Sequence, residues 1–205
     1  MKNLVNCILI LLILFKVNEC LAAWLPVAPP KAKLCSRCHG DEGKSTNPRY
    51  PKLAGQHRDY LIKQLHDFQA GKQGPRNNPL MVTITDELSD TDIIQLANYF
   101  AYQQPSTGLA QKATLDLGKR LYQGGDREHG IPACSACHGP AGAGNPSAKF
   151  PQLAGQHPRY IIRQLQSFQL HQRHNDPQQV MQDIASRMSP EQMAAVANYI
   201  SGLYE

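Results

Sequence analysis

The sequence repeats itself at a spacing of about 100 residues, and this repeat limits the possible fold more than any other feature. The stretch PKLAGQHRDYLIKQLHDFQ at residues 51–69 agrees with PQLAGQHPRYIIRQLQSFQ at residues 151–169 at twelve of nineteen positions. Ala-Asn-Tyr recurs at residues 97–99 and 197–199. Duplication of a module of roughly 90 residues explains both matches. The 205 residues therefore divide into two small domains, and the Pro, Ser and Gly of residues 104–108 suit the join.

The N-terminus has the pattern of a secretory signal peptide, which we predict at residues 1–23. Lys2 opens a short basic region, residues 4–15 are almost wholly apolar, and small residues suited to signal peptidase follow. A membrane-spanning helix needs about 20 apolar residues, although an uncleaved anchor remains the alternative. We therefore predict an exported chain with an N-terminal domain at residues 24–106 and a C-terminal domain at residues 107–205.

Cleavage changes both the charge and the cysteine count. Removing Lys2, Lys16 and Glu19 from 21 basic and 16 acidic residues lowers the formal charge from +5 to +4. This mild charge, without a basic run or interleaved aromatic residues, argues against nucleic-acid binding. The mature chain keeps four of the six cysteines: Cys35, Cys38, Cys134 and Cys137.

The hydrophobic pattern predicts an all-α fold. Apolar residues recur at helical spacing in each half, and alternating strand patterns with hairpin turns are missing. The last helix of each half has a start signal, because Ser89 precedes Asp92, and Ser189 precedes Gln192, by three positions. A further helix is expected from about Ala110 to Tyr122. The residues expected to be buried in the two last helices are Ile93, Leu96, Ala97 and Phe100, and Met193, Val196, Ala197 and Ile200.

Each half contains one Cys-x-x-Cys-His motif. Two thiols on one helical turn can each form a thioether bond with a haem vinyl group, and the adjacent histidine can bind the iron. A structural zinc site would need four ligands in one place, and a thioredoxin-like dithiol would need a βαβ unit. We therefore predict two covalently attached haem c groups per chain. The cysteines are Cys35 and Cys38 for one haem and Cys134 and Cys137 for the other, with His39 and His138 as axial iron ligands.

The repeat also indicates the second axial ligands. Met81 and Met181 stand at the same offset of 100, shortly before the capped last helix of each half. A lone methionine is more often a core residue, but equivalent placement in both halves favours iron ligation. Met188 is the rival in the second half, and its position suits a hydrophobic staple. Ligation by His57 and His157, which are also equivalent, remains the other alternative.

This ligand set predicts electron transfer without catalysis. A thioether is a soft ligand that favours Fe(II) and raises the reduction potential. An iron with both axial positions filled does not readily bind a substrate, so we expect an electron carrier that is not an enzyme and has no small-molecule substrate. A two-haem peroxidase would need one open iron site, and the pair of equivalent methionines argues against it.

These residues resemble the cytochrome c4 family of exported two-haem cytochromes c. The resemblance rests on the paired Cys-x-x-Cys-His motifs, the Pro-x-Leu-Ala-Gly-Gln segments, Met81, Met181 and the Ala-Asn-Tyr repeats, and it spans nearly the whole mature chain. It implies two tandem class I cytochrome c domains, each wrapped around one haem. It also implies that the carbonyls of Pro51 and Pro151 accept the histidine ring N–H.

The resemblance further implies a location and partners. It places the chain in the periplasm, where it takes electrons from a quinol-oxidising complex and delivers them to a terminal haem–copper oxidase, with peripheral association with the inner membrane. Similar two-haem chains accept electrons within enzyme complexes such as flavin-linked sulfide dehydrogenases, which is the alternative function. The sequence departs from the family at the Pro-rich residues 24–33, and the loop before Met181 differs from the loop before Met81.

Overall fold

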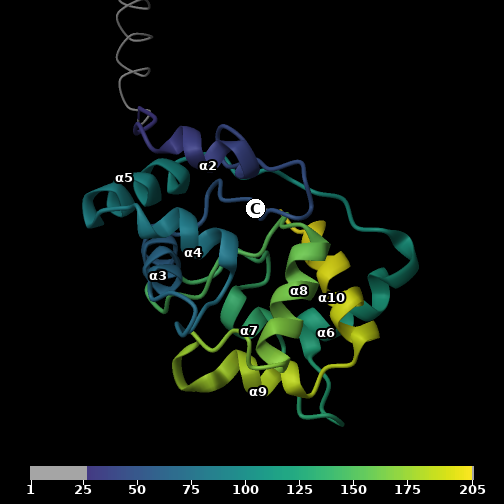
Figure 1. The fold of residues 1–205 in the computed structure, drawn as a ribbon. Helices are drawn as coiled ribbons and strands as arrows, with labels where there is room; N and C mark the ends of the chain where they lie inside the picture. Colours follow the sequence, from purple (N-terminus) through teal and green to yellow (C-terminus); the bar gives the residue numbers. More distant parts are fainter. Residues whose placement is uncertain (1–26, 205) are drawn as a thin grey trace, which may run out of the picture.

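The computed structural model describes residues 27–204 and consists of helices joined by long loops (Figure 1). Among these residues there are isolated β-bridges but no β-strand, so the predicted all-α fold is confirmed. The predicted signal peptide lies outside the described residues. No helix within residues 27–204 is long and apolar enough to cross a membrane. The helices are α2 (Ala32–His39), α3 (Arg58–Gln69), α4 (Pro79–Asp86), α5 (Asp90–Ala101), η1 (Lys112–Thr114), α6 (Leu115–Gly124), α7 (Ser135–His138), α8 (Pro158–Gln169), η2 (Pro177–Gln179), α9 (Val180–Ser186) and α10 (Pro190–Ser201).

Each half of the chain has its own hydrophobic core. In the first half, α3 packs against α4 and α5. In the second half, α10 packs against α6 and α8, and α8 also packs against α9. Figure 1 shows α2 to α5 gathered on one side and α6, α8 and α10 on the other. All eight residues expected to be buried in α5 and α10 are buried. The described residues thus form two separate cores, one in each half of the chain.

Reciprocal capping boxes fix where α5 and α10 begin. The Ser89 hydroxyl accepts from the Asp92 N–H at 3.2 Å, and the Asp92 carboxylate accepts from the Ser89 N–H at 2.9 Å. Ser189 and Gln192 make the same pair of bonds at 3.2 and 2.9 Å. Each cap satisfies backbone N–H groups that a helix start leaves unpaired. Both start signals read from the sequence are therefore confirmed.

The helix expected over residues 110–122 begins at Lys112 as the 3-10 turn η1 and becomes α6 at Leu115, so that prediction was wrong only at its first residues. The physical reason is the side-chain amide of Asn198 on α10. Its oxygen accepts from the Gln111 N–H at 2.7 Å, and its Nδ2 donates to the Gln111 carbonyl at 2.8 Å. These two bonds hold Gln111 in an extended conformation, and the chain turns into a helix only after it.

The linker between the halves runs directly between the two Pro-x-Leu-Ala-Gly-Gln segments. A Cβ on Gly55 would lie 2.4 Å from the ring of Pro105, and a Cβ on Gly155 would lie 2.4 Å from the carbonyl oxygen of Ser106. Both glycines also have a positive φ, at +72° and +67°. Glycine is required at these two positions because any side chain would push the linker away.

Candidate functional site

Two buried histidines end the helical turns that contain the cysteine pairs. His39 is the last residue of α2 and His138 is the last residue of α7. His39 Nδ1 lies 2.8 Å from the carbonyl oxygen of Pro51, and His138 Nδ1 lies 3.0 Å from that of Pro151. A carbonyl only accepts, so each Nδ1 is protonated and each Nε2 has a free lone pair. Burial lowers the pKa of both rings, which keeps them neutral and able to bind iron.

The cysteines lie on the same helical turns as these histidines and form no disulfides. Cys35 and Cys134 are partly covered, and burial raises the pKa of each thiol to about 11. Within residues 27–204, no three His, Cys, Asp or Glu side chains gather as a metal-binding group. The four-ligand set of the zinc alternative is therefore missing, whereas each Cys-x-x-Cys pair has the placement that thioether attachment needs.

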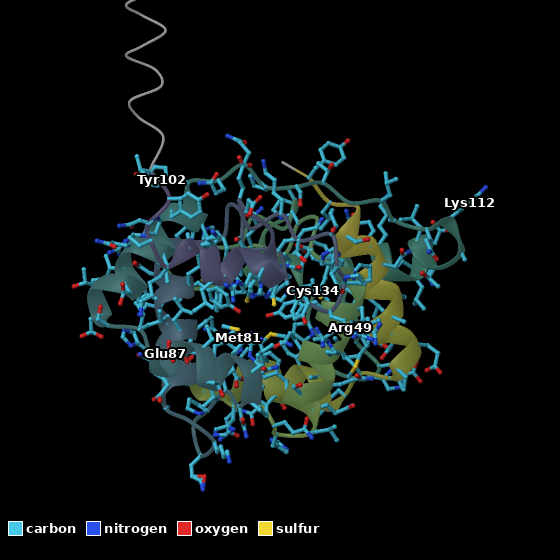
Figure 2. The ribbon with its side chains drawn as sticks, turned by 45° about the horizontal axis from the view of Figure 1, so that its top comes forward. Arg49, Met81, Glu87, Tyr102, Lys112 and Cys134 are labelled. Carbon is cyan, nitrogen blue, oxygen red and sulfur yellow. The ribbon has the colours of Figure 1, made fainter. Side chains whose placement is uncertain are left out.

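The two methionines occupy equivalent positions in the first turn of a helix. The Met81 N–H donates to the Asn78 side chain at 3.1 Å at the start of α4. The Met181 N–H donates to the Asp176 carboxylate at 2.8 Å at the start of α9. Both methionines are partly buried, and Figure 2 shows Met81 and Cys134 in the middle of the molecule. Each half thus has one buried histidine at the end of a helical turn and one partly buried methionine in the first turn of a later helix.

The loops before the two methionines differ, as the sequence predicts. Asn78 caps α4 directly and is followed by Pro79. The second half instead has a 3-10 turn in which Gln178 and Gln179 adopt left-handed backbone angles, with φ of 56° and 59°. Non-glycine residues rarely adopt this conformation. The environment of Met181 is therefore different from that of Met81.

Of the alternative ligands, Met188 and His157 have other contacts in the structure, and His57 does not. Met188 is buried in the second core together with Met193, so packing accounts for it. His57 and His157 precede α3 and α8 as N-cap residues. His157 Nε2 lies 2.9 Å from the carbonyl oxygen of Ser45 in the other half of the chain. His57 Nε2 is buried without a hydrogen-bond partner.

The His157 contact predicts a small pH dependence of stability. Burial is the main cause that lowers the pKa of His157; the Ser45 carbonyl opposes this and the nearby Lys52 charge adds to it. The unfolded chain then binds a proton at a pH where the folded chain does not, so stability is lost as the pH falls from about 6.5 towards the folded pKa. We expect a loss below about 1 kcal/mol, because solvent screens this partly exposed ring.

Denaturant unfolding at pH 7.5 and pH 5.5 measures this effect. The free energy of unfolding should differ less between the two pH values in His157→Gln than in the unmodified chain. His66→Gln, on an exposed face of α3, should leave that difference unchanged. An unchanged difference in His157→Gln would contradict the assignment.

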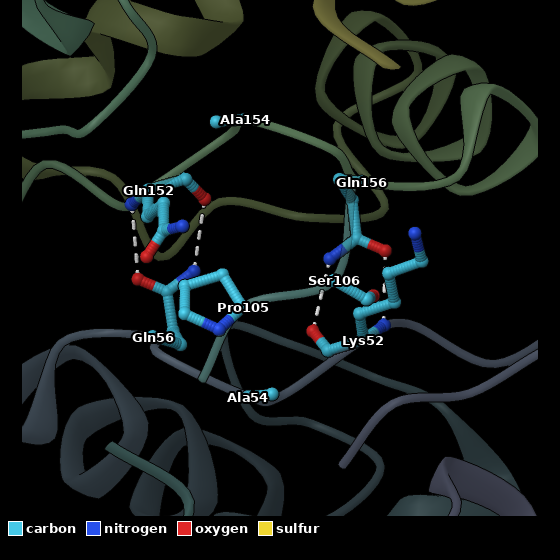
Figure 3. Close-up of a pocket in the computed structure, with 8 residues that line it drawn as sticks. All are labelled: Lys52, Ala54, Gln56, Pro105, Ser106, Gln152, Ala154 and Gln156. Atoms are coloured by element: carbon cyan, nitrogen blue, oxygen red, sulfur yellow. Dashed lines mark hydrogen bonds between the residues drawn. The ribbon is translucent and has the colours of Figure 1, made fainter. Parts of the chain in front are cut away.

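Two buried glutamines join the halves at the Pro-x-Leu-Ala-Gly-Gln segments (Figure 3). Gln156 accepts from the Lys52 N–H at 2.9 Å and donates to the Lys52 carbonyl at 2.9 Å. Gln56 accepts from the Gln152 N–H at 3.0 Å and donates to the Gln152 carbonyl at 2.9 Å. Each glutamine side chain therefore pairs with the backbone of the residue that follows the proline of the other half.

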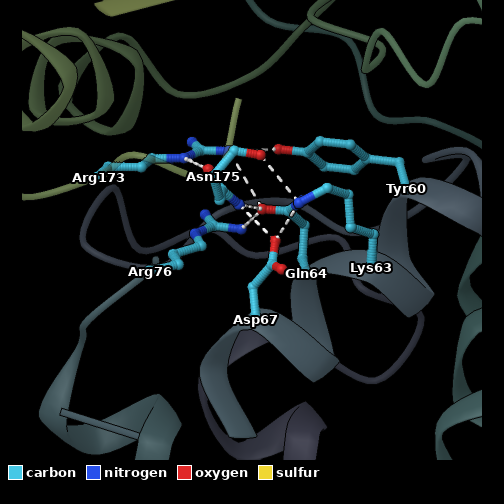
Figure 4. A network of polar contacts seen from close by, with 7 residues as sticks. All are labelled: Tyr60, Lys63, Gln64, Asp67, Arg76, Arg173 and Asn175. Atoms are coloured by element: carbon cyan, nitrogen blue, oxygen red, sulfur yellow. Dashed lines mark hydrogen bonds and ion pairs between the residues drawn. The ribbon is translucent and has the colours of Figure 1, made fainter. Parts of the chain in front are cut away.

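A second interface between the halves contains two buried arginines (Figure 4). Arg76 donates to the Tyr160 hydroxyl at 2.8 Å, and Arg173 donates to the Tyr60 hydroxyl at 3.1 Å. Each bond crosses from one half to the other, and the two arginines also form an isolated backbone bridge. Each arginine is only 8% exposed.

This arginine interface has an excess of positive charge. Asp67 accepts from Lys63 at 2.6 Å and from Asn175 at 2.7 Å. Within the described residues, no carboxylate is hydrogen-bonded to either guanidinium group. Burial alone would raise the pKa of Tyr60, but the charges of Arg173 and Arg76 outweigh it and bring that pKa below its usual range. The sequence did not indicate this network, because Arg76 and Arg173 are 97 positions apart and so fall outside the repeat offset.

Comparison with known proteins identifies the family. The family model for cytochrome c matches residues 32–103 and again residues 115–203. Cytochrome c4 of Pseudomonas aeruginosa is 43% identical over 175 residues, covering 85% of this chain and 86% of the relative. The thiosulfate dehydrogenase electron acceptor of Thiomonas intermedia is 39% identical, covering 88% and 82%. The crystal structure of reduced cytochrome c4 from Pseudomonas stutzeri superposes with a TM-score of 0.83 at 40% identity, covering 85% of this chain and 95% of that one.

Two matched domains, each with one Cys-x-x-Cys-His motif, define a two-haem c-type cytochrome. The cysteine pairs at residues 35 and 38 and at residues 134 and 137 fit two covalently attached haems. At this identity over most of both chains, the protein belongs to the cytochrome c4 family. It is thus a dihaem electron carrier.

Proposed function

We propose that His39 and Met81 bind the iron of the first haem, and that His138 and Met181 bind the iron of the second. The most direct support is that the same pair of residues occurs in both halves. Each half has a neutral histidine with a free Nε2 and a methionine at the start of the equivalent helix. The haem supplies one-electron exchange at its iron. The protein holds the imidazole in one orientation through the proline carbonyl, and an iron bound by one histidine and one methionine would have no free site for a substrate.

We further propose that the chain works in the periplasm, without enzymatic activity of its own. In this role it passes single electrons from a quinol-oxidising complex to a terminal haem–copper oxidase and associates at most peripherally with the inner membrane. Support comes from the histidine and the methionine that each half offers as iron ligands and from the sequence pattern of residues 1–23. The domain limits proposed for this carrier are residues 24–106 and 107–205.

A second candidate function is electron acceptance from a dehydrogenase within an enzyme complex. The observation that favours it is the similarity to a thiosulfate dehydrogenase electron acceptor; a flavin-linked sulfide dehydrogenase would be a partner of the same kind. Both functions use the same haem chemistry and differ in the electron donor.

Reconstitution with defined partners separates these functions. The oxidised protein is mixed with membranes containing a quinol-oxidising complex and a haem–copper oxidase, and oxygen uptake with quinol is followed. In parallel it is mixed with a thiosulfate or sulfide dehydrogenase and its substrate. Faster oxygen uptake supports the first function, whereas reduction only by a dehydrogenase supports the second.

Export and haem attachment predict a defined mass. We expect protein from the periplasmic fraction to lack about the first 23 residues and to have gained the mass of two haem groups, because the signal is cleaved and thioether bonds survive denaturation. Mass spectrometry of the denatured protein measures both. The variant Cys134→Ala with Cys137→Ala should show one haem, and a retained N-terminus would instead support the uncleaved anchor.

A further inference from the structure

We propose that Gln56 and Gln156 are positioning residues, each of which tunes the iron-binding histidine of the opposite domain and thereby couples the two haem potentials. The inference rests on the proposed roles of His39 and His138.

One peptide group connects the His39 ring to the other domain. The carbonyl of Pro51, which accepts from His39 Nδ1, and the N–H of Lys52 belong to the same planar peptide unit. That N–H donates to the side-chain oxygen of Gln156 at 2.9 Å. A continuous hydrogen-bond chain therefore runs from the His39 ring through the peptide group to a side chain of the other domain.

The second domain contains the mirror arrangement. His138 Nδ1 donates to the Pro151 carbonyl at 3.0 Å, and the Gln152 N–H of the same peptide group donates to Gln56 at 3.0 Å. Each glutamine also accepts from the backbone N–H of the histidine that follows it in its own domain. The glutamines are thus anchored in one domain and act on the other.

Peptide resonance determines whether this chain of hydrogen bonds raises or lowers the haem potential. A hydrogen bond to the peptide N–H increases the negative charge on the carbonyl oxygen, because bonds in such a chain polarise one another. A stronger carbonyl acceptor draws the Nδ1 proton more firmly, which makes the imidazole a more basic ligand. A more basic ligand stabilises Fe(III) and lowers the potential, so loss of the glutamine should raise the potential of the haem in the other domain.

Burial preserves these contacts. Gln56 and Gln156 are both 8% exposed, and they line the same small pocket with Lys52, Gln152 and the linker residues (Figure 3). Water therefore competes weakly for the amide groups. Since the same amides also tie the domains together, changing the contact between the domains changes both histidines.

The test uses the haem-loaded proteins Gln156→Leu and Gln56→Leu, which keep the side-chain volume and remove the hydrogen bonds. We expect Gln156→Leu to shift the His39 Nδ1–H proton resonance and raise the potential of the first haem. Gln56→Leu should do the same to His138 and the second haem. The expected change in each reduction equilibrium is at least threefold, which is about 30 mV for a one-electron couple.

NMR assigns each effect to its domain, because the two ring N–H signals belong to separate histidines whatever the sixth ligands are. Gln69→Leu and Gln169→Leu are the matched controls, since, among the described residues, the hydrogen bonds of these side chains stay within their own domains. Gln69 bonds to the Thr85 and Leu88 carbonyls and to the His66 ring, and Gln169 bonds to the Ala185 and Met188 carbonyls. Their effects should stay in their own domains.

Shifts that cross to the opposite domain in both glutamine variants support the proposal. It is overturned by effects confined to the substituted domain, by equal shifts of both histidines in each variant, or by no shift. Failure of the methionine ligands would appear in the haem spectra and would not alter the pattern of ring N–H shifts, so the two failures are distinguishable.

Discussion

Met81→Ala and Met181→Ala should each abolish the Fe(III)–methionine absorption of one haem and leave the other haem unchanged. Loss of the soft thioether removes the preference for Fe(II), so the potential of the affected haem should fall by more than about 100 mV, given that axial ligands tune haem potentials over roughly 0.8 V. The vacated position should also bind carbon monoxide in the reduced state. Visible spectra and potentiometric titration of each variant measure these changes.

Two control variants make this prediction specific. Leu80→Ala changes the half-exposed neighbour of Met81 and should preserve both haem spectra. Met188→Ala should destabilise the fold by about 2 to 5 kcal/mol through the cavity it leaves in the second core, again with both spectra intact. The ligand assignment would fail if Met188→Ala altered a haem while Met181→Ala left both unchanged.

Arg76→Leu should lower the free energy of unfolding by about 3 kcal/mol or more. The substitution removes the bonds to Gln64 and to Tyr160 of the other half and the stacking of the guanidinium 4.5 Å above the Phe68 ring. The Tyr160 hydroxyl loses its charged donor, which is the costly way to break such a bond, whereas Gln64 still accepts from Arg173 and Asn175. Denaturant unfolding of the haem-loaded protein, followed through haem absorption, gives the value.

Arg76→Lys should restore little of this stability, because a single ammonium cannot replace the several donors of the guanidinium. Lys72→Leu is the matched control, since Lys72 is an exposed cation in the same loop, and it should change the free energy by less than about 0.5 kcal/mol. An Arg76→Leu protein as stable as the Lys72→Leu protein would contradict the account of this interface.

The features predicted from the sequence are those that depend on local chemistry. The capping boxes at Ser89 and Ser189 need only residues three positions apart, and the buried faces of α5 and α10 follow from helical spacing. The equivalent placement of Met81 and Met181 was visible because the two halves can be compared with each other. Each of these signals lies within one half of the chain.

Contacts between the halves were not predictable in this way. Gln56 and Gln156 occupy equivalent positions of the repeat, but finding the same residue in both halves does not show whether it contacts its own domain or the other one. Arg76 and Arg173 do not share the repeat offset, so comparison of the halves does not align them. The late start of α6 depends on the side chain of Asn198, which lies 87 positions from Gln111.

A potentiometric titration of the intact protein in the presence and absence of carbon monoxide tests the central claim most directly. Two haems that each have a histidine and a methionine ligand should be reduced in two one-electron steps at the raised potentials typical of such ligation, and neither reduced haem should bind carbon monoxide. Two low-potential haems that bind carbon monoxide freely would contradict the assignment of this protein as an electron carrier with filled coordination spheres.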